Sequence, residues 1–237
     1  MQVGGRSQTL AEVLARGLLP TALNGDSPQH LANSLEPLPY RAYSISSLPQ
    51  DGCVHLLVRQ ARRDDGSLGL ASGWLTAYAP VGAEIEMRVR ANPNFRLPGD
   101  NRPLILIGNG TGLAGLRSHL KGRALAGHLR NWLIFGERNA DRDFYYREEI
   151  EDWQARDVLE RVDLAFSRDQ ATRMYVQHRL HMAADTVRAW LATGAALYVC
   201  GSIVGMAPGV EAALTHIIGP KALERLAAEG RYRRDVY

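Results

Sequence analysis

The chain has 237 residues, of which 46% are hydrophobic and 22% are charged, a balance typical of globular proteins. The formal net charge is only +3, and the basic residues form no long stripe, which argues against a nucleic-acid binder. The longest apolar runs are too short to span a bilayer, and the N-terminal residues lack the pattern of a signal peptide.

Cysteine and histidine usage gives little sign of a metal or a disulfide. Cys53 and Cys200 form no CxxC pair and have no metal-ligand spacing. Two free thiols favour a reducing compartment, so a cytoplasmic location is expected. His178 and His181 are three residues apart, but with no further ligand nearby a solvated helix face is the favoured interpretation and no metal is expected.

The first 39 residues carry few structural signals. Residues 9–16 predict a short amphipathic helix. The prolines and the Asn-Gly-Asp sequence of residues 20–39 indicate loop and turns. This part is therefore expected to be irregular or helical.

Residues 40–98 have a β-like composition. Strands are predicted over residues 43–47, 54–60 and 84–90, the last because apolar and charged residues alternate. A short helix is predicted over residues 72–78, with its first residue, Ser72, as the cap. The prediction is a small antiparallel barrel or sheet.

A proline-rich linker over residues 93–103 leads into a different pattern. Apolar four-residue strands now alternate with helices, which implies a doubly wound parallel sheet in a domain spanning residues 99–237. The fold class is thus α/β plus all-β. The expected strands are 104–107, 132–135, 162–166 and 196–200, and the expected helices are 112–126, 148–155, 206–217 and those between 176 and 191.

A glycine-rich sequence follows the first of these strands. Gly110, Gly112 and Gly115 satisfy GxGxxG between a strand and a helix, which is the context that a dinucleotide loop requires. Glycine lets backbone amides approach a pyrophosphate, and the helix N-terminus favours its negative charge. A tight turn without a ligand is the alternative. The loop lacks the Gly-Lys-Ser/Thr of a P-loop.

The residues after the next two strands indicate which nucleotide binds. Glu137 follows the second strand, where an acid would suit the ribose hydroxyls of NAD. After the third strand, a hydroxyl and two guanidinium groups suit a phosphate dianion better than a neutral diol. NADPH is therefore favoured, with ordinary surface arginines as the alternative. The residues concerned are Ser167, Arg168, Arg173 and Tyr175.

Several separated motifs, in the correct order, resemble those of the ferredoxin–NADP reductase superfamily. The similarity is greatest to its diflavin branch, which includes sulfite reductase flavoproteins and NADPH–cytochrome reductases, and it covers about residues 40–237. The matching segments are 41–47 (the RxYS motif), 95–98 (FRLP), 108–117 (GxGTG), 167–177 (SR followed by YVQ), 198–201 (YVCG) and the C-terminal 231–237.

The resemblance implies an FAD site in the first part of this region. Arg41 is expected to pair with the FAD pyrophosphate, and Tyr43 to pack against the isoalloxazine ring. Ser44 is expected to hydrogen-bond near flavin N5, the atom that receives the hydride. A second FAD motif is matched by Gly69, Leu70, Ala71 and Ser72, where amides at a helix start hold the pyrophosphate.

The resemblance also implies the NADPH site and the reacting groups. Cys200 and Asp235, together with Ser44, are expected to surround the reacting carbon, because a carboxylate favours the positive charge that grows on nicotinamide as hydride leaves. Tyr237 is expected to lie over the flavin and to move aside for nicotinamide. The expected nucleotide contacts are Gly110, Thr111, Gly112, Arg138, Ser167, Arg168, Arg173, Tyr175 and Gln177.

The sequence departs from the family pattern in three places. Gly115 replaces a proline, which is expected to loosen the helix start but to keep the loop. Ser202 replaces an acid and residues 203–205 replace a polar and basic stretch, which is expected to alter contacts to the nicotinamide ribose or pyrophosphate. The barrel strands that precede RxYS in the family are not found, so an incomplete barrel is expected, completed by a partner or by a longer, membrane-associated parent flavoprotein.

The leading hypothesis is an FAD-dependent NADPH reductase module that passes electrons to a flavodoxin, an FMN domain or a haem protein. One alternative is a flavin reductase that releases reduced flavin. The other is a nucleotide-binding interaction domain without catalysis. The response of added flavin to NADPH distinguishes the three.

Overall fold

The computed structural model describes residues 2–3, 6–7, 9, 17–18 and 27–237 and divides into two units, residues 1–42 and 43–237. The described residues of the first unit form two short antiparallel strand pairs and one helix: β1 Gln2–Val3 with β2 Arg6–Ser7, β3 Gly17–Leu18 with β4 Glu36–Pro37, and α2 Pro28–Ser34. The helix predicted over residues 9–16 lies outside the described residues, apart from Thr9.

The prediction of loop and turns over residues 20–39 is wrong at α2. Pro28 occupies the first helical turn, where its missing N–H costs nothing. The hydroxyl of Ser27 accepts a hydrogen bond from the backbone N–H of His30 at 3.3 Å and so caps the helix. Pro28 was interpreted as a turn residue, but in the structure it begins a helix.

The first part of the second unit contains short helical turns in place of the predicted strands. Residues 43–47, 54–60 and 84–90 form no β-ladder; isolated bridges join Ile45 to Leu56 and Arg62 to Leu68. The structure therefore does not show the predicted antiparallel barrel. The elements in this part are η1 Pro49–Asp51, α3 Leu70–Gly73, the π-helical turn η2 Trp74–Tyr78 and η3 Pro93–Phe95.

The alternating residues 84–90 show why the strand prediction failed. A strand is stable only when a neighbour pairs its backbone and a layer covers its apolar face. Here Ile85, Met87 and Val89 are 45%, 54% and 67% exposed. The alternating pattern therefore gives the segment an apolar face, but no layer of the described residues packs over that face.

The predicted helix over residues 72–78 exists but begins earlier, at Leu70, with Gly69 as its N-cap. Ser72 is therefore inside the helix and does not cap it. Its hydroxyl instead accepts a hydrogen bond from the backbone N–H of Ala61 at 3.0 Å, which ties the helix to the preceding segment.

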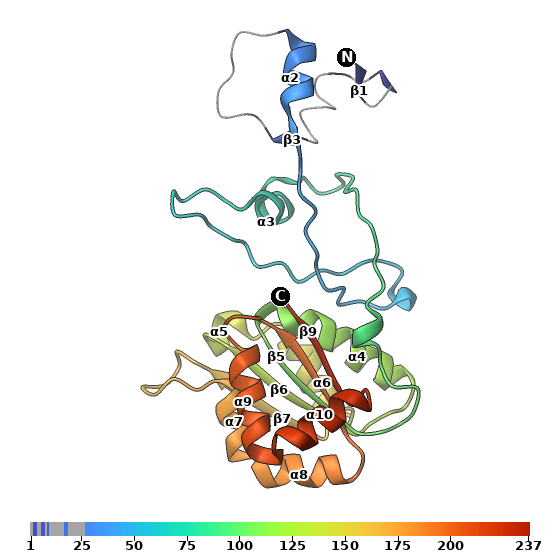
Figure 1. The fold of residues 1–237 in the computed structure, drawn as a ribbon, viewed down its shortest axis with the longest axis vertical. Coiled ribbons are helices and arrows are strands. Elements are labelled where there is room, and N and C mark those ends of the chain that lie inside the picture. The colour runs from blue at the N-terminus through green and yellow to red at the C-terminus, as the bar shows by residue number, and fades with distance from the viewer. Residues whose placement is uncertain (1, 4–5, 8, 10–16, 19–26) are drawn as a thin grey trace. The chain divides into compact units, whose positions relative to one another are not determined.

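The rest of the second unit is a five-stranded, fully parallel sheet with helices on both faces (Figure 1). The order is β7-β6-β5-β8-β9, so the chain winds outward from β5 in one direction and then from β8 in the other. The strands are β5 Leu104–Asn109, β6 Asn131–Glu137, β7 Arg161–Phe166, β8 Ala196–Gly201 and β9 Tyr232–Val236. The predicted α/β fold of this part is confirmed.

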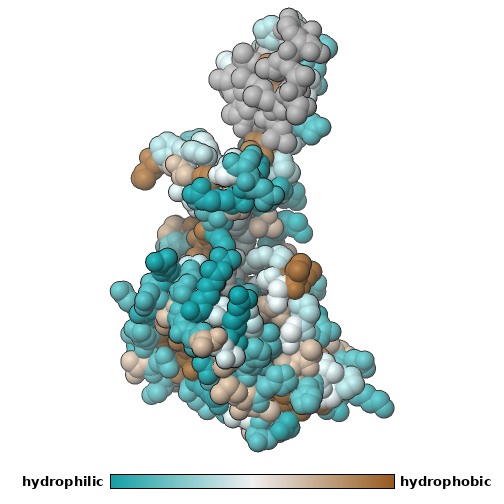
Figure 2. Space-filling view, turned by 90° about the vertical axis from the view of Figure 1, so that its left-hand side faces the viewer, coloured by the Kyte–Doolittle hydropathy of each residue, from teal (hydrophilic) through white to brown (hydrophobic). Residues whose placement is uncertain are grey.

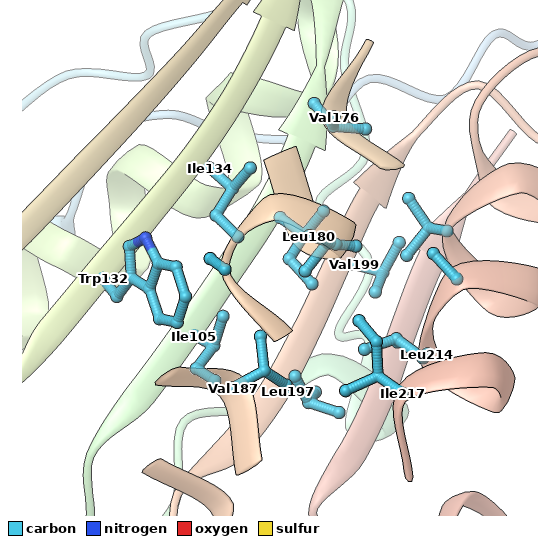
Figure 3. Close-up of a cluster of buried hydrophobic side chains, with 14 of the residues drawn as sticks. Ile105, Trp132, Ile134, Val176, Leu180, Val187, Leu197, Val199, Leu214 and Ile217 are labelled. Atoms are coloured by element: carbon cyan, nitrogen blue, oxygen red, sulfur yellow. The ribbon is translucent and has the colours of Figure 1, made fainter. Parts of the chain in front are cut away.

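The strands form because their apolar residues are buried on both sides. Along β5, Leu104 and Leu106 face one core cluster, and Ile105 and Ile107 face the other. Figure 3 shows the second cluster, where strand side chains meet those of the covering helices. One face is covered by η4 Gly110–Gly112, α4 Leu113–Leu125 and α6 Arg147–Ala155, and the other by α7 Val176–Met182, α8 Ala184–Ala192, α9 Ala207–Ile218 and α10 Pro220–Ala228.

The predicted strands and helices of this part are found within a few residues, and three elements were missed. The missed ones are α5 Ala140–Asp143, α10 and β9. Strand β9 is rich in charged residues and has no apolar run. It is a strand because it pairs with β8 along its length, from Leu197 opposite Tyr232 to Gly201 opposite Val236.

No helix in the described part of the chain is long and apolar enough to cross a bilayer. Figure 2 shows one face, on which hydrophilic side chains predominate and hydrophobic ones form small separate patches.

A buried polar pair joins α4 to β6. Asn131 is fully buried, and its amide oxygen accepts a hydrogen bond from the guanidinium of Arg123. Its amide nitrogen donates to the carbonyls of His128 and Val158 at 2.8 and 2.7 Å. Arg123 and Val158 are buried, so their bonds to the asparagine are shielded from water.

Asn131→Leu should therefore destabilise the fold by about 2 kcal/mol, because it leaves buried polar groups unpaired. Chemical denaturation would measure the loss in free energy of unfolding. Asn139→Leu, at a half-buried position after β6, is the control and should cost clearly less. Equal losses would contradict the importance of the buried network.

His119 makes the stability of the fold sensitive to acid. Its ring stacks on Phe95, and its Nε2 lies 2.8 Å from the Phe95 carbonyl oxygen. Burial lowers the pKa of His119 from 6.5 to about 4. The unfolded chain therefore binds a proton below about pH 6.5 that the folded chain does not bind, so stability falls as the pH falls towards 4.

Between about pH 6.5 and pH 5, this histidine should cost roughly 2 kcal/mol of stability. Denaturation at both pH values, compared between the native chain and His119→Phe, isolates the effect. The phenylalanine variant should lose less stability over this interval. An identical pH dependence in both would rule out His119 as the source.

Candidate active site

The sheet brings the motif residues to one edge. All five strands are parallel, so their carboxyl ends lie together. The winding direction reverses between β5 and β8, and ligands of open α/β sheets bind in the crevice at such a point. The glycine-rich loop follows β5, and Cys200 and Gly201 end β8.

The glycine-rich loop packs directly on the end of β8. Gly110 has a φ of +57°, which favours glycine. A Cβ on Gly112 would overlap the carbonyl group of Cys200, so only glycine fits there. The side-chain oxygen of Asn109 accepts a hydrogen bond from the backbone N–H of Ser202 at 3.0 Å and holds the two strand ends together. This close-packed strand–turn–helix is the cradle that a dinucleotide pyrophosphate requires.

Three predicted catalytic residues, far apart in sequence, meet at this edge. Strand pairing places Asp235 of β9 opposite Cys200 of β8. The hydroxyl of Ser44 donates to Asp235 Oδ2 at 3.1 Å, and the thiol of Cys200 donates to the same oxygen over 3.8 Å. The amide of Asn92 donates to the other oxygen, Oδ1, at 3.0 Å. The carboxylate is therefore held by three donors from three different segments.

The segment that carries Ser44 is fixed to α4. Ser46 is buried, and its carbonyl accepts a hydrogen bond from the guanidinium of Arg117 at 2.6 Å. Further along, the ammonium of Lys121 contacts both carboxylate oxygens of Asp51 at 2.6 Å. Two anchors on one helix thus set the position of residues 44–51.

Cys200 is a neutral thiol in this site. It is fully buried, and burial, followed by the neighbouring charge of Asp235, raises the pKa of the thiol well above its usual range. The sulfur therefore acts as a weak donor to the carboxylate and not as a thiolate nucleophile.

Gly115 leaves the space around this cluster open. A Cβ at this position would lie 3.3 Å from Cys200 Sγ and 3.8 Å from the Cβ of Ser44. The helix start is regular despite the absence of the family proline, since α4 runs without interruption from Leu113. The loop is therefore kept at Gly115, where a side chain would crowd the Cys200 sulfur.

Tyr237 lies next to the glycine-rich loop. Its hydroxyl is 3.3 Å from the hydroxyl of Thr111. Its backbone N–H donates to the carbonyl of Gly201 at 3.0 Å, and its carbonyl accepts from the N–H of Ile203 at 2.9 Å. The C-terminal residue is thus tied to the end of β8 beside the predicted catalytic residues.

The predicted phosphate ligands lie on the other side of the loop, after β6 and β7. The backbone N–H of Arg168 donates to the carbonyl of Arg138 at 2.8 Å, so the two exposed arginines are neighbours. Ser167 is half-buried and precedes Arg168, and Tyr175 is the N-cap of α7. Arg173 is exposed in the intervening turn, and the side chain of Gln177 packs against Gly209.

Some predicted FAD residues are not placed with this cluster. Gly69, Leu70, Ala71 and Ser72 form the start of α3, with Gly69 as its N-cap. The backbone N–H of Gly69 donates to the carbonyl of Ala61 at 2.9 Å, within the same segment. Tyr43 is half-buried at the beginning of the second unit, and the exposed Arg41 belongs to the first unit. Their roles towards FAD stay predictions.

Two residues at this edge were missed. Asn92 lies just before the predicted linker of residues 93–103, and no local pattern marks it as a hydrogen-bond partner of Asp235. Arg59 forms an ion pair with Glu137 beside Gly110, although it lies in a predicted strand. Among the described residues, no group of three or more histidines, cysteines or acids is placed to hold a metal ion.

Comparison with known proteins agrees with this geometry. The oxidoreductase NAD-binding domain family matches residues 106–212, which span β5 to α9. Sulfite reductase [NADPH] flavoprotein alpha-components match most of the chain. The protein from Mannheimia succiniciproducens is 39% identical over 89% of this chain, and that from Vibrio cholerae is 40% identical over 87%. The Neisseria meningitidis protein is 37% identical over 98%.

These matches agree with the resemblance to the ferredoxin–NADP reductase superfamily, and to its diflavin branch, that the motifs at residues 41–47 and 198–201 indicated. The chain spans 38%, 36% and 40% of the length of these three relatives, respectively. The sheet edge between β5 and β8 is the candidate active site.

Proposed function

We propose that this chain is an NADPH-dependent flavoprotein reductase module that moves a hydride from NADPH to FAD and passes electrons to a separate acceptor. The observation that carries the proposal is the Asp235 carboxylate held by Ser44, Cys200 and Asn92 at the carboxyl edge of the sheet. The printed names of the relatives, which specify NADPH and a flavoprotein, support both cofactors.

The residues present fit an NADP-type dinucleotide. The loop from Gly110 to Gly112 would hold its pyrophosphate, since a side chain at Gly112 would fill the cradle. Ser167, Arg168 and Arg173 would hold the 2′-phosphate, with Arg138 next to Arg168. NADPH is favoured over NADH because the carboxylate of Glu137 is already paired with Arg59 and with the backbone N–H of Arg138.

Asp235 would supply the electrostatic part of the reaction. Its carboxylate favours the positive charge that develops on nicotinamide as hydride leaves. Ser44, Cys200 and Asn92 orient it before substrate arrives, so no reorganisation is needed during the reaction. Hydride transfer itself is the chemistry of the bound cofactors. The chain would position the two cofactors and supply the electrostatic environment of the reacting atoms.

Tyr237 would control access to this site. It is half exposed, and its ring lies at the end of the chain beside Thr111. In the proposal it covers the flavin ring, and it moves aside when nicotinamide enters. The hydrogen bond between the two hydroxyls is weak enough in an exposed position to break during each turnover.

The remaining parts of the proposal concern the partners. Residues 40–98 would contribute to FAD binding and residues 99–237 would bind NADPH. The acceptor would be a haem protein, a flavodoxin or an FMN domain. The chain itself would be cytoplasmic, alone or as part of a larger membrane-associated flavoprotein. The names of the relatives, which specify an alpha-component of sulfite reductase, support a separate electron acceptor, and the two free cysteines support a reducing compartment.

Anaerobic addition of NADPH to the chain loaded with FAD tests the proposal. Bleaching of protein-bound flavin is the expected result. Bleaching of flavin that dissociates freely would favour a flavin reductase instead. No bleaching, with NADPH bound, would leave a nucleotide-binding interaction domain and overturn the proposed reaction.

Asn92 provides a further test, because it holds only Asp235 Oδ1 while Ser44 and Cys200 hold Oδ2. Asn92→Ala should slow flavin reduction about tenfold, the cost of losing one hydrogen bond to a charged group. The affinity for NADP⁺ should stay unchanged, since the nucleotide loop is separate. Stopped-flow absorbance gives the rate and calorimetry the affinity. An unchanged rate would show that Asn92 does not position the carboxylate.

A further inference from the structure

An acidic side chain lies at the phosphate loop, where an anionic ligand would be repelled. Glu137 ends β6, and its side chain is only 4% exposed. A Cβ on Gly110 would lie 3.3 Å from Glu137 Oε1, so this carboxylate oxygen stands directly beside the loop. A negative charge at this distance opposes the binding of a pyrophosphate.

Arg59 offsets this charge. Its guanidinium forms an ion pair with the same carboxylate oxygen, and Nη2 also lies 3.3 Å from the Cβ position of Gly110. A second contact, a hydrogen bond from Nη2 to the hydroxyl of Tyr145 at 3.4 Å, helps to hold it there. The other carboxylate oxygen accepts a hydrogen bond from the backbone N–H of Arg138 at 2.7 Å.

We infer that Arg59 is a positioning residue of the dinucleotide site: it neutralises Glu137 and so makes the glycine-rich loop receptive to an anionic pyrophosphate. The inference rests on the proposed function, because it takes an NADP-type dinucleotide as the ligand. Arg59 lies outside the sheet, in the segment before α3, and would act on the nucleotide loop from there.

The pairing also explains how an acid at the end of the second strand is compatible with NADPH. In that position an available carboxylate would accept hydrogen bonds from ribose hydroxyls and repel a 2′-phosphate. Both oxygens of Glu137 are engaged within the protein. Removal of Arg59 would expose this charge to the ligand, while replacement of both residues by neutral ones would abolish the conflict.

A double-mutant cycle tests the inference through binding and not through activity. The affinity for NADP⁺ is measured by calorimetry in the native chain, Arg59→Ala, Glu137→Gln and the double variant. Arg59→Ala should bind about tenfold more weakly, because an unpaired charge faces the phosphates. Glu137→Gln should bind at least as tightly as the native chain, and the double variant should regain affinity to within about threefold of it.

Two results of the cycle would contradict this role of Arg59. Unchanged affinity in Arg59→Ala would overturn the inference, and so would a double variant as weak as Arg59→Ala, since Arg59 would then act on its own. Arg62→Ala, an exposed arginine of the same segment that contacts Gln60 and Gly66, is the control and should bind normally. Should Arg59→Ala not fold, Arg59→Gln and Arg59→Lys provide the comparison: the lysine variant must bind more tightly than the glutamine variant.

Failure of the inference is distinguishable from failure of the proposed function. A native chain that does not bind NADP⁺ overturns both. A native chain that binds NADP⁺ and reduces flavin, with four equal affinities in the cycle, overturns only the role of Arg59.

Discussion

Replacing Asp235 with asparagine should slow reduction of bound FAD by NADPH roughly a hundredfold to a thousandfold, the range typical of losing one preorganised electrostatic group. The change keeps the size of the side chain and one oxygen that can accept from either Ser44 or Asn92, which bind different oxygens of the carboxylate. It removes the negative charge and one acceptor. The rate should therefore fall while the affinity for NADP⁺ changes little, which is the signature of an interaction made mainly in the transition state.

Single-turnover absorbance under anaerobic conditions measures this rate directly. Glu211→Gln is the matched control, because Glu211 is another carboxylate beside β9, where it pairs with Arg234 at 2.6 Å. The control should reduce flavin at the native rate. Equal slowing in both variants would mean that general charge near β9 matters, and the specific role of Asp235 would be rejected.

The parallel sheet was predictable because its strands carry the signal in their own residues. Strands β5, β6 and β8 are apolar runs that must be buried on both faces, so their sequence alone indicates their place. Strand β9 carries no such signal, since arginines and an aspartate dominate it. Its conformation comes from pairing with β8, and long-range pairing is invisible to a local pattern.

The site was predictable only in part, for the same reason. The glycine-rich loop can be identified from one short stretch of sequence, because its glycines directly follow a strand and precede a helix. Ser44, Cys200 and Asp235 were found through resemblance to a family, because their meeting depends on the register of β9 against β8. Asn92 and Arg59 carry no motif, and only the fold shows that each contacts an acid at the sheet edge.

Replacing Arg168 with alanine should change which nucleotide the chain prefers. The guanidinium would face a phosphate dianion in NADPH and a neutral hydroxyl in NADH, so its removal costs only the phosphate-bearing ligand a charge-assisted pair. Affinity for NADPH should fall about a hundredfold, whereas affinity for NADH should change less than about threefold. The neighbouring Arg138 should retain part of the preference, since both arginines lie at adjacent strand ends.

Fluorescence or calorimetric titration with both nucleotides measures the ratio of affinities. Arg156→Ala is the control, because Arg156 is also an exposed arginine but lies at the end of α6, where it pairs with Asp152 at 3.1 Å. This variant should leave both affinities unchanged. Losses of equal size for NADPH and NADH in Arg168→Ala would refute the assignment of the 2′-phosphate to β7, because a residue that reads this phosphate must distinguish the two ligands.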